Sequence, residues 1–257
     1  MENLGLTGLK PMPQSRVSER KPTIIAHRGA SAVAPENTLP AFEAALHAGA
    51  DGIEFDVQRT VDDHLVIFHD DDVSRTTNGT GMVSELALPE LESLDAGGWF
   101  DDRFRETQIP TLGRLFTWAR TNDLLLFLEM KDPFRYPNIE KQVADMIRKH
   151  DLVERVQVRS FFHAHLLQLH KIAPEISISE LWLDHLPWRG EIIFSTINLR
   201  YGLFSQQDIA EIHGWGRSVT TWVVDNLDTG RQLRDWELDG ITTNNPGHLL
   251  RIFPIGI

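Results

Sequence analysis

The 257-residue sequence contains no cysteine, which excludes disulfides, thiolate metal ligands and a cysteine nucleophile. No segment approaches the roughly 20 apolar residues of a membrane-spanning helix, and residues 1–22 lack the apolar core of a signal peptide. Basic residues are also scarce, since 25 Lys and Arg oppose 37 Asp and Glu, for a net charge of −12. Because acidic surfaces repel nucleic acids and anionic membranes, we expect neither of these partners. The lack of a signal peptide and of a membrane-spanning segment predicts a cytoplasmic location. An anionic small-molecule ligand would need local cations.

Short apolar runs alternate with amphipathic segments along most of the chain. The expected strands are 23–27, 52–58, 64–69, 124–131, 155–160, 175–181, 191–197, 218–224 and 240–243. The expected helices are 38–49, 111–121, 138–150, 163–173, 206–213 and 227–236. Repeated strand–helix units predict a parallel sheet, and about eight units in a chain of this length favour a closed TIM (β/α)8 barrel.

One long segment interrupts this alternation. Residues 70–110 are rich in Asp, Gly, Thr and Pro and are too long for an ordinary connection. They predict a small insertion lobe after the second strand region, over one end of the barrel. We expect residues 1–22 to form an N-terminal tail and residues 23–257 a single domain.

Three carboxylates mark one end of the predicted barrel. Glu54 and Asp56 share a strand face opposite the apolar face, and Glu129 comes near the end of strand 124–131. Barrel active sites lie at the carboxyl ends of the strands, so these groups should converge there. All-oxygen ligands favour Mg²⁺ or Ca²⁺ over zinc. Alternatively, Glu54 and Asp56 line the wet face of an antiparallel strand, but Glu129 and two strand-end histidines favour the metal site.

Two histidines, His27 and His69, end apolar strands and are the candidates for proton transfer, because histidine titrates near neutral pH. Taken singly, each could instead be a capping or buried structural histidine. Arg28 and Lys131 supply positive charge for an anionic substrate. Asp70 pairs with one of these cations or orients a histidine, and the sequence leaves both open.

An ordered series of motifs resembles the glycerophosphodiester phosphodiesterase family. The motifs are H-R-G at 27–29, P-E-N-T at 35–38, A-F at 41–42, G-A-D-x-x-E-x-D-V at 49–57, H-D at 69–70, R-T-T-N-G-x-G at 75–81, D-A-G-x-W-F at 95–100, I-P-T-L at 109–112, L-E-M-K at 128–131, S-F at 160–161 and I-T-T-N-N-P at 241–246. The resemblance covers nearly all of residues 23–248.

The resemblance implies a TIM barrel that hydrolyses glycerophosphodiesters to sn-glycerol 3-phosphate and an alcohol. The residues that it implies are Glu54, Asp56 and Glu129 as ligands of one divalent cation, His27 and His69 as an acid–base pair, and Arg28 and Lys131 at the phosphate, with Trp222 as a further substrate-binding candidate. The alternatives are a related phospholipase or other phosphodiesterase of the same superfamily, a metal amidohydrolase, and a non-catalytic phosphoester-binding protein. A metal amidohydrolase typically needs an H-x-H pair on its first strand, and the expected first strand, 23–27, has none. A non-catalytic binding protein would be expected to have lost one of the five catalytic or metal residues, and all five are present.

The sequence also departs from the family pattern. Asp63 replaces a turn glycine, Asp225 follows the Trp222 strand where Asn is usual, and Asn244 replaces a common Asp. Arg159 occupies a position that is usually neutral. It either faces the lumen, where it could bind a head group or second phosphate, or lies at the barrel's outer edge. Asn37 is expected to cap the helix that begins near Thr38.

Overall fold

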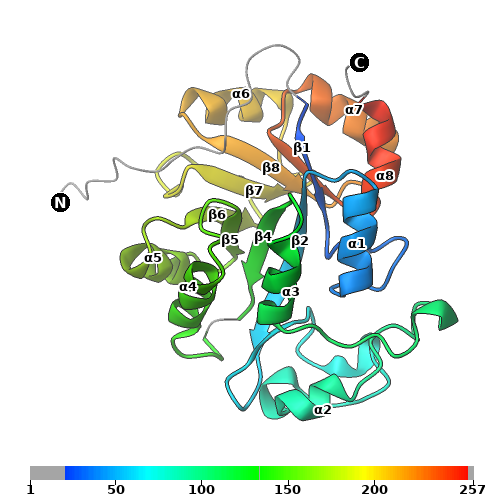
Figure 1. Cartoon of the computed structure of the whole chain (residues 1–257). Helices are drawn as coiled ribbons and strands as arrows, with labels where there is room; N and C mark the ends of the chain where they lie inside the picture. The colour runs from blue at the N-terminus through cyan, green and yellow to red at the C-terminus, as the bar shows by residue number, and fades with distance from the viewer. Residues whose placement is uncertain (1–20, 133, 254–257) are drawn as a thin grey trace.

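The computed structural model describes residues 21–132 and 134–253. Eight parallel strands close into a barrel in the order β1–β2–β4–β5–β6–β7–β8–β9, with β9 pairing back onto β1 (Figure 1). Their bounds are β1 Thr23–Ala26, β2 Gly52–Arg59, β4 Leu125–Met130, β5 Val156–Ser160, β6 Ser177–Trp182, β7 Thr196–Arg200, β8 Ser218–Trp222 and β9 Gly240–Thr243. The predicted TIM barrel is confirmed.

Helices cover the outside of the barrel. They are α1 Leu39–His47, α3 Leu112–Ala119, α4 Ile139–Lys149, α5 His163–Ile172, α6 Gln206–Gly214, α7 Leu227–Asp235 and the short α8 Pro246–Leu249. Only the β6–β7 connection, which the structure describes throughout, has no helix. The alternation of strand side chains explains this layout: Ile53 and Phe55 pack outward into the helix layer beside Phe42 and Phe116, while Glu54 and Asp56 face the lumen.

The insertion lobe extends from the barrel in the lower part of Figure 1. It begins with β3 (Leu65–Ile67), which pairs antiparallel to β2, and contains α2 (Leu88–Glu92) and three 3₁₀ turns, Val73–Arg75, Val83–Glu85 and Asp102–Phe104. A small apolar cluster of its own, including Phe68, Val83 and Leu91, holds it together. Asp63, in the turn before β3, has φ +65°, as expected for a residue in a glycine position.

Three sequence expectations were wrong in detail. The expected strand 64–69 is the antiparallel β3 and not a barrel strand. The expected strand 191–197 begins later and is β7. The apolar residues Ile193 and Phe194 precede the strand and pack into the core outside the barrel, while the strand itself carries buried polar residues, Thr196 and Asn198, that face the lumen. Asn37 does not cap α1. Thr38 is the N-cap residue, and the Asn37 amide instead donates to Asp56 Oδ2 at 2.8 Å.

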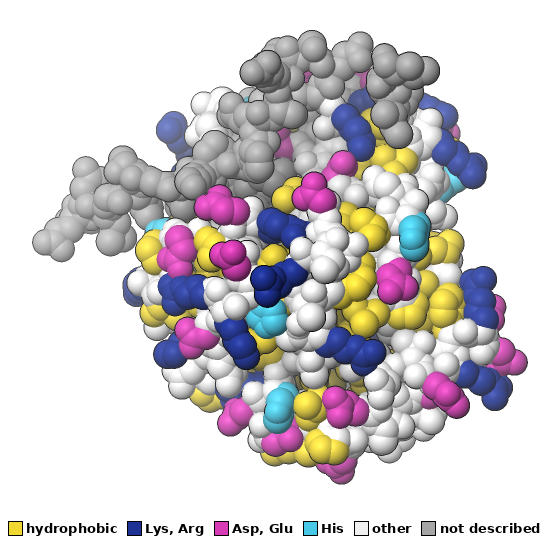
Figure 2. All heavy atoms as spheres, in the orientation of Figure 1, with side chains coloured by type: hydrophobic (Ala, Val, Ile, Leu, Met, Phe, Trp, Pro, Cys, Tyr) yellow, Lys and Arg dark blue, Asp and Glu magenta, His cyan; other side chains and the backbone are white. Residues whose placement is uncertain are grey.

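In Figure 2, acidic and basic side chains are interspersed over the visible face, with hydrophobic side chains between them. No described helix is long and apolar enough to cross a membrane. The expected tail, residues 1–22, lies outside the described residues except for Lys21 and Pro22.

Candidate active site

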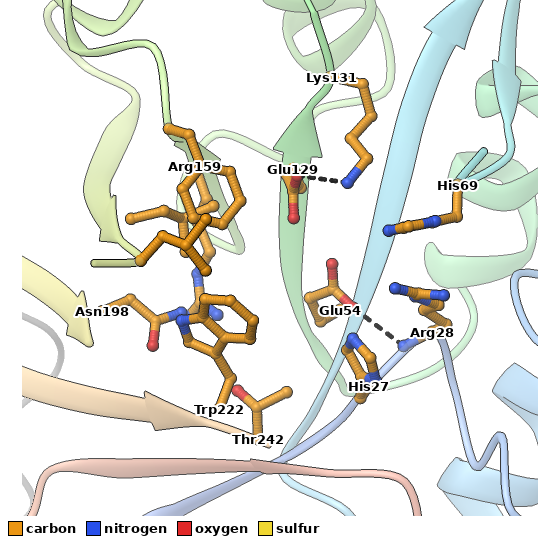
Figure 3. A pocket seen from close by; sticks show the side chains of 13 residues that line it. His27, Arg28, Glu54, His69, Glu129, Lys131, Arg159, Asn198, Trp222 and Thr242 are labelled. Carbon is orange, nitrogen blue, oxygen red and sulfur yellow. Dashed lines mark hydrogen bonds and ion pairs between the residues drawn. The ribbon is translucent and has the colours of Figure 1, made fainter. Parts of the chain in front are cut away.

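A pocket of about 250 Å³ lies at the carboxyl ends of the barrel strands (Figure 3). Eight of the nine residues predicted to form the site line it: His27, Arg28, Glu54, His69, Glu129, Lys131, Arg159 and Trp222. The ninth, Asp56, is 1% exposed and lies within the acidic cluster behind the pocket wall. The fold therefore brings all nine together, from strands and loops that are far apart in the sequence.

The three carboxylates form a compact cluster. Glu54 and Asp56 project from β2, and Glu129 projects from the neighbouring β4, where it is paired in register with Asp56. Each residue offers one oxygen, and these oxygens lie within 4.8 Å of one another. Glu54 and Asp56 are buried and Glu129 is partly buried. Carboxylate oxygens at this spacing match the ligands that Mg²⁺ and Ca²⁺ prefer, so the cluster is compatible with one divalent cation.

Two cations partly neutralise this cluster. Lys131 Nζ lies 2.6 Å from Glu129 Oε1 and 3.2 Å from Asp56 Oδ1. The Arg28 backbone N–H donates to Glu54 Oε2 at 2.9 Å, and Arg28 Nε lies 3.4 Å from Asp56 Oδ2. The repulsion among the three carboxylates is therefore smaller than it would be for unpaired groups, and a metal ion must compete with Lys131 for two of them.

The surroundings raise the pKa of two of the carboxylates and lower that of the third. Burial and the charge of Asp56 raise the pKa of Glu54 to about 7. Burial also raises the pKa of Glu129. At Asp56 burial acts in the same direction, but Lys131 and Arg28 outweigh it and lower the pKa. In the metal-free protein, Glu54 thus holds a proton over part of the neutral range while Asp56 stays ionised.

His27 is held by an amide that is itself held by a carboxylate. Its Nδ1 lies 2.7 Å from Asn244 Oδ1, while Asn244 Nδ2 donates to Asp225 Oδ2 at 2.6 Å and the Asn244 backbone N–H donates to Asp225 Oδ1 at 2.8 Å. Because an ionised carboxylate only accepts, the amide nitrogen must face Asp225 and the amide oxygen must face His27. His27 Nδ1 therefore carries a hydrogen, which leaves Nε2 as the proton acceptor. Burial and Arg28 lower the pKa of His27.

His69 has a different partner. Its Nδ1 lies 2.5 Å from Asp70 Oδ1, and Asp70 Oδ2 accepts from Arg75 in the insertion lobe. Arg75 also donates to both oxygens of Glu36, at 2.7 and 3.0 Å, and Glu36 accepts from Arg28 at 2.8 Å. A continuous ionic network thus joins His69 to Arg28, and the insertion lobe supplies its central residue.

Gln58 positions the backbone around His69, and the sequence did not identify it as a site residue. Gln58 is 1% exposed and donates through Nε2 to the carbonyl oxygens of Phe68, His69 and Asp70, at 3.1, 3.1 and 2.7 Å. Its Oε1 accepts from Tyr136 Oη at 2.9 Å. In the sequence, only its position pointed to this role: Gln58 lies on the same face of β2 as Glu54 and Asp56. Its amide fixes the backbone that carries His69.

Arg159 lies in the lumen, not at the barrel's outer edge. It is 1% exposed, and its guanidinium carbon lies 4.1 Å from the centre of the Phe127 ring. Burial lowers its pKa to about 10, against the opposing effect of Glu54 and Glu129. Arg159 therefore remains a cation near neutral pH.

Comparison with known proteins agrees with this geometry. Residues 27–248 match the model of the glycerophosphoryl diester phosphodiesterase family. A glycerophosphodiester phosphodiesterase from Caldanaerobacter subterraneus subsp. tengcongensis is 37% identical over 90% of this chain and 98% of that protein. The chain belongs to this family. The resemblance found in the motifs is confirmed, and the enzyme class is that of the phosphoric diester hydrolases.

Solved structures give the same result. An Oleispira antarctica phosphodiesterase, in complex with the product sn-glycerol-3-phosphate, has a TM-score of 0.85 at 27% identity and covers 90% of this chain and 96% of its own. A glycerophosphodiester phosphodiesterase from Agrobacterium tumefaciens has a TM-score of 0.75 at 29% identity, with 90% and 100% covered. Both share the barrel described above.

Proposed function

We propose that the chain hydrolyses glycerophosphodiesters to sn-glycerol 3-phosphate and an alcohol, with a divalent cation and two histidines. The family assignment supports the reaction, and the related Oleispira antarctica structure with bound sn-glycerol-3-phosphate supports the product. The observation that carries the mechanism is the convergence of His27, His69, Arg28 and Lys131 around the acidic cluster in one pocket. A cytoplasmic location stays a prediction.

Glu54, Asp56 and Glu129 would hold the cation, Mg²⁺ or Ca²⁺. When bound, it supplies positive charge that stabilises the nonbridging oxygens of the phosphate. Arg28 is equipped to share this task, since its Nε is buried and has no hydrogen-bond partner among the described residues, while Nη1 is held by Glu36. Its Nε is within ion-pair distance of Asp56 Oδ2, at 3.4 Å, but makes no hydrogen bond to it, so a phosphate oxygen would supply a hydrogen-bond acceptor for this N–H.

The two histidine environments favour different roles. His27, neutral with Nε2 unprotonated, would accept the proton of the attacking hydroxyl, which belongs to water or to the glycerol moiety. His69, whose Nδ1 is held by the Asp70 carboxylate, would give a proton from Nε2 to the departing alkoxide. The attacking oxygen forms a bond to phosphorus as the bond between phosphorus and the alcohol oxygen breaks, and the alcohol leaves neutral. Attack by water gives sn-glycerol 3-phosphate directly, whereas attack by the glycerol hydroxyl gives a cyclic phosphate that a water molecule then opens to sn-glycerol 3-phosphate.

The test replaces each histidine by alanine. We expect both His27→Ala and His69→Ala to lose about 10²- to 10⁴-fold in kcat with little change in melting temperature, because both side chains lie at the pocket and outside the apolar core. His47→Ala, on the exposed side of α1, is the matched control and should stay fully active. Near-normal turnover in either pocket variant would remove that histidine from the mechanism.

A further inference from the structure

The pocket has a second side, away from the two histidines. Figure 3 shows Arg159, Asn198, Trp222 and Thr242 on this side, facing the acid–base residues across the pocket. They come from four strands on one side of the barrel, β5, β7, β8 and β9, and β6 lies between the first two. We call these four residues the inner polar subsite.

Arg159 has more hydrogen-bond donors than partners. Its Nε and Nη2 both approach the same oxygen, Gln157 Oε1, at 3.3 Å. When the Asn198 amide is oriented to donate to the Thr220 carbonyl oxygen at 3.2 Å, its own oxygen accepts from Arg159 Nη1 at 3.1 Å. A guanidinium has five N–H groups, so these three contacts leave two N–H groups without a partner in the described part of the protein.

The charge of Arg159 also lacks a close partner. Within residues 21–132 and 134–253, no carboxylate oxygen lies within the ion-pair distance of 4.0 Å from its guanidinium. Glu54 and Glu129 act on it only from farther away. Buried charges in proteins are normally paired, because an unpaired buried charge destabilises the folded protein.

Two further polar atoms of the subsite are unsatisfied. Trp222 Nε1 and Thr242 Oγ1 are buried and have no hydrogen-bond partner among the described residues. Arginine and indole nitrogens only donate, so the subsite offers mainly donors. Buried polar atoms almost always have partners, and a ligand rich in acceptors would supply the ones missing here.

We propose that the inner polar subsite binds a second anionic group, a carboxylate or phosphate carried by the alcohol of the diester. This inference rests on the proposed function and names the substrate class of the same pocket. A full positive charge selects an anion over a hydroxyl group, and it disfavours alcohols that carry a quaternary ammonium ion. The flat face of Phe127 under the guanidinium fixes the plane in which the two free N–H groups point.

The experiment compares two matched glycerophosphodiesters. In one the alcohol ends in a carboxylate, and in the other a primary amide of the same shape replaces it. For the native enzyme, we expect kcat/KM to be about 10- to 100-fold higher for the carboxylate, the range for hydrogen bonds to a charged group. Arg159→Met should abolish this preference, and Arg159→Lys should keep part of it. Arg120→Met removes the same charge at an exposed position at the end of α3 and should retain the preference.

Other outcomes would overturn the inference. If Arg159→Met slowed both diesters equally, Arg159 would serve the acidic cluster or a part common to all substrates. Trp222→Phe, which removes the Nε1 donor and keeps a smaller aromatic ring, provides a second variant if the Met variant unfolds, and it should lower the preference several-fold. Equal turnover of both diesters by the native enzyme refutes only the subsite. Failure to hydrolyse these diesters and glycerophosphocholine as well would refute the proposed function.

Discussion

Replacing Glu129 by Gln should separate metal binding from folding. Glu129 is one of three oxygen donors in the cluster and is also the closest partner of Lys131, at 2.6 Å. The variant keeps the volume and one carbonyl oxygen but removes a charge. Changes outside the ligand shell already cost 10- to 100-fold in metal affinity, so we expect loss of a charged ligand to cost at least about 100-fold.

The expected magnitude follows from mass action. Metal at a hundredfold excess over its dissociation constant stabilises the native enzyme by about 2.7 kcal/mol. At the same metal concentration, the variant would gain about 0.4 kcal/mol, because the concentration then only equals its dissociation constant. For a chain of this size 1 kcal/mol corresponds to about 2–4 °C, so the metal-dependent shift should fall from roughly 5–11 °C to roughly 1–2 °C.

The assay is thermal unfolding with Mg²⁺ or Ca²⁺ titrated into chelator-treated protein. Only the metal-dependent shift is compared, because Glu129→Gln also removes the ion pair with Lys131 and changes the metal-free stability. Glu211→Gln, on the exposed face of α6, makes the same charge change and should show the native shift. An equal metal-dependent shift in the native protein and in Glu129→Gln would refute the assignment of Glu129 as a ligand.

Three further predictions concern the residues that hold the histidines. Because the pKa of His27 is lowered from 6.5 and its neutral form accepts the proton, the acidic limb of the pH profile of kcat/KM should have its midpoint below pH 6.5; a midpoint above that value would argue against His27 as the base. Asp225→Asn should release the Asn244 amide and lower kcat about 5- to 10-fold with KM unchanged, as loss of about 1 kcal/mol of orientation would give. Gln58→Glu replaces the amide donor by a carboxylate oxygen, which faces three carbonyl oxygens and can only accept. Thermal unfolding should therefore show a destabilisation of about 2–3 kcal/mol. Tyr136→Phe removes a single hydrogen bond to Gln58 and should destabilise the protein less.

The sequence could predict the barrel and its acidic cluster for a local reason. Strand side chains alternate with a period of two, so Glu54 and Asp56, which alternate with the apolar Ile53, Phe55 and Val57, had to share a face, and the apolar residues between them had to meet the helices. The parallel arrangement then put Glu129 at the same end. In contrast, β7 was misplaced because its lumen-facing Thr196 and Asn198 break the apolar run on which strand prediction depends.

The contacts that orient the site could not be predicted in this way. Asn37 reads as a helix cap from its local sequence, yet its amide holds Asp56, 19 positions away in the chain. Asp225 reaches His27 only through Asn244, and the link from Asn244 to His27 spans 217 positions. Such contacts depend on how the strands close around the barrel, and no local spacing encodes them.

The most direct test of the whole account is the metal-dependent release of sn-glycerol 3-phosphate from a glycerophosphodiester of an uncharged alcohol, glycerophosphoglycerol, followed before and after chelation and after return of Mg²⁺ or Ca²⁺. We predict turnover that disappears on chelation and returns with the metal, while circular dichroism shows the fold unchanged throughout, because the apolar core does not include the acidic cluster. Full activity after exhaustive chelation, or a product other than sn-glycerol 3-phosphate, would contradict the account.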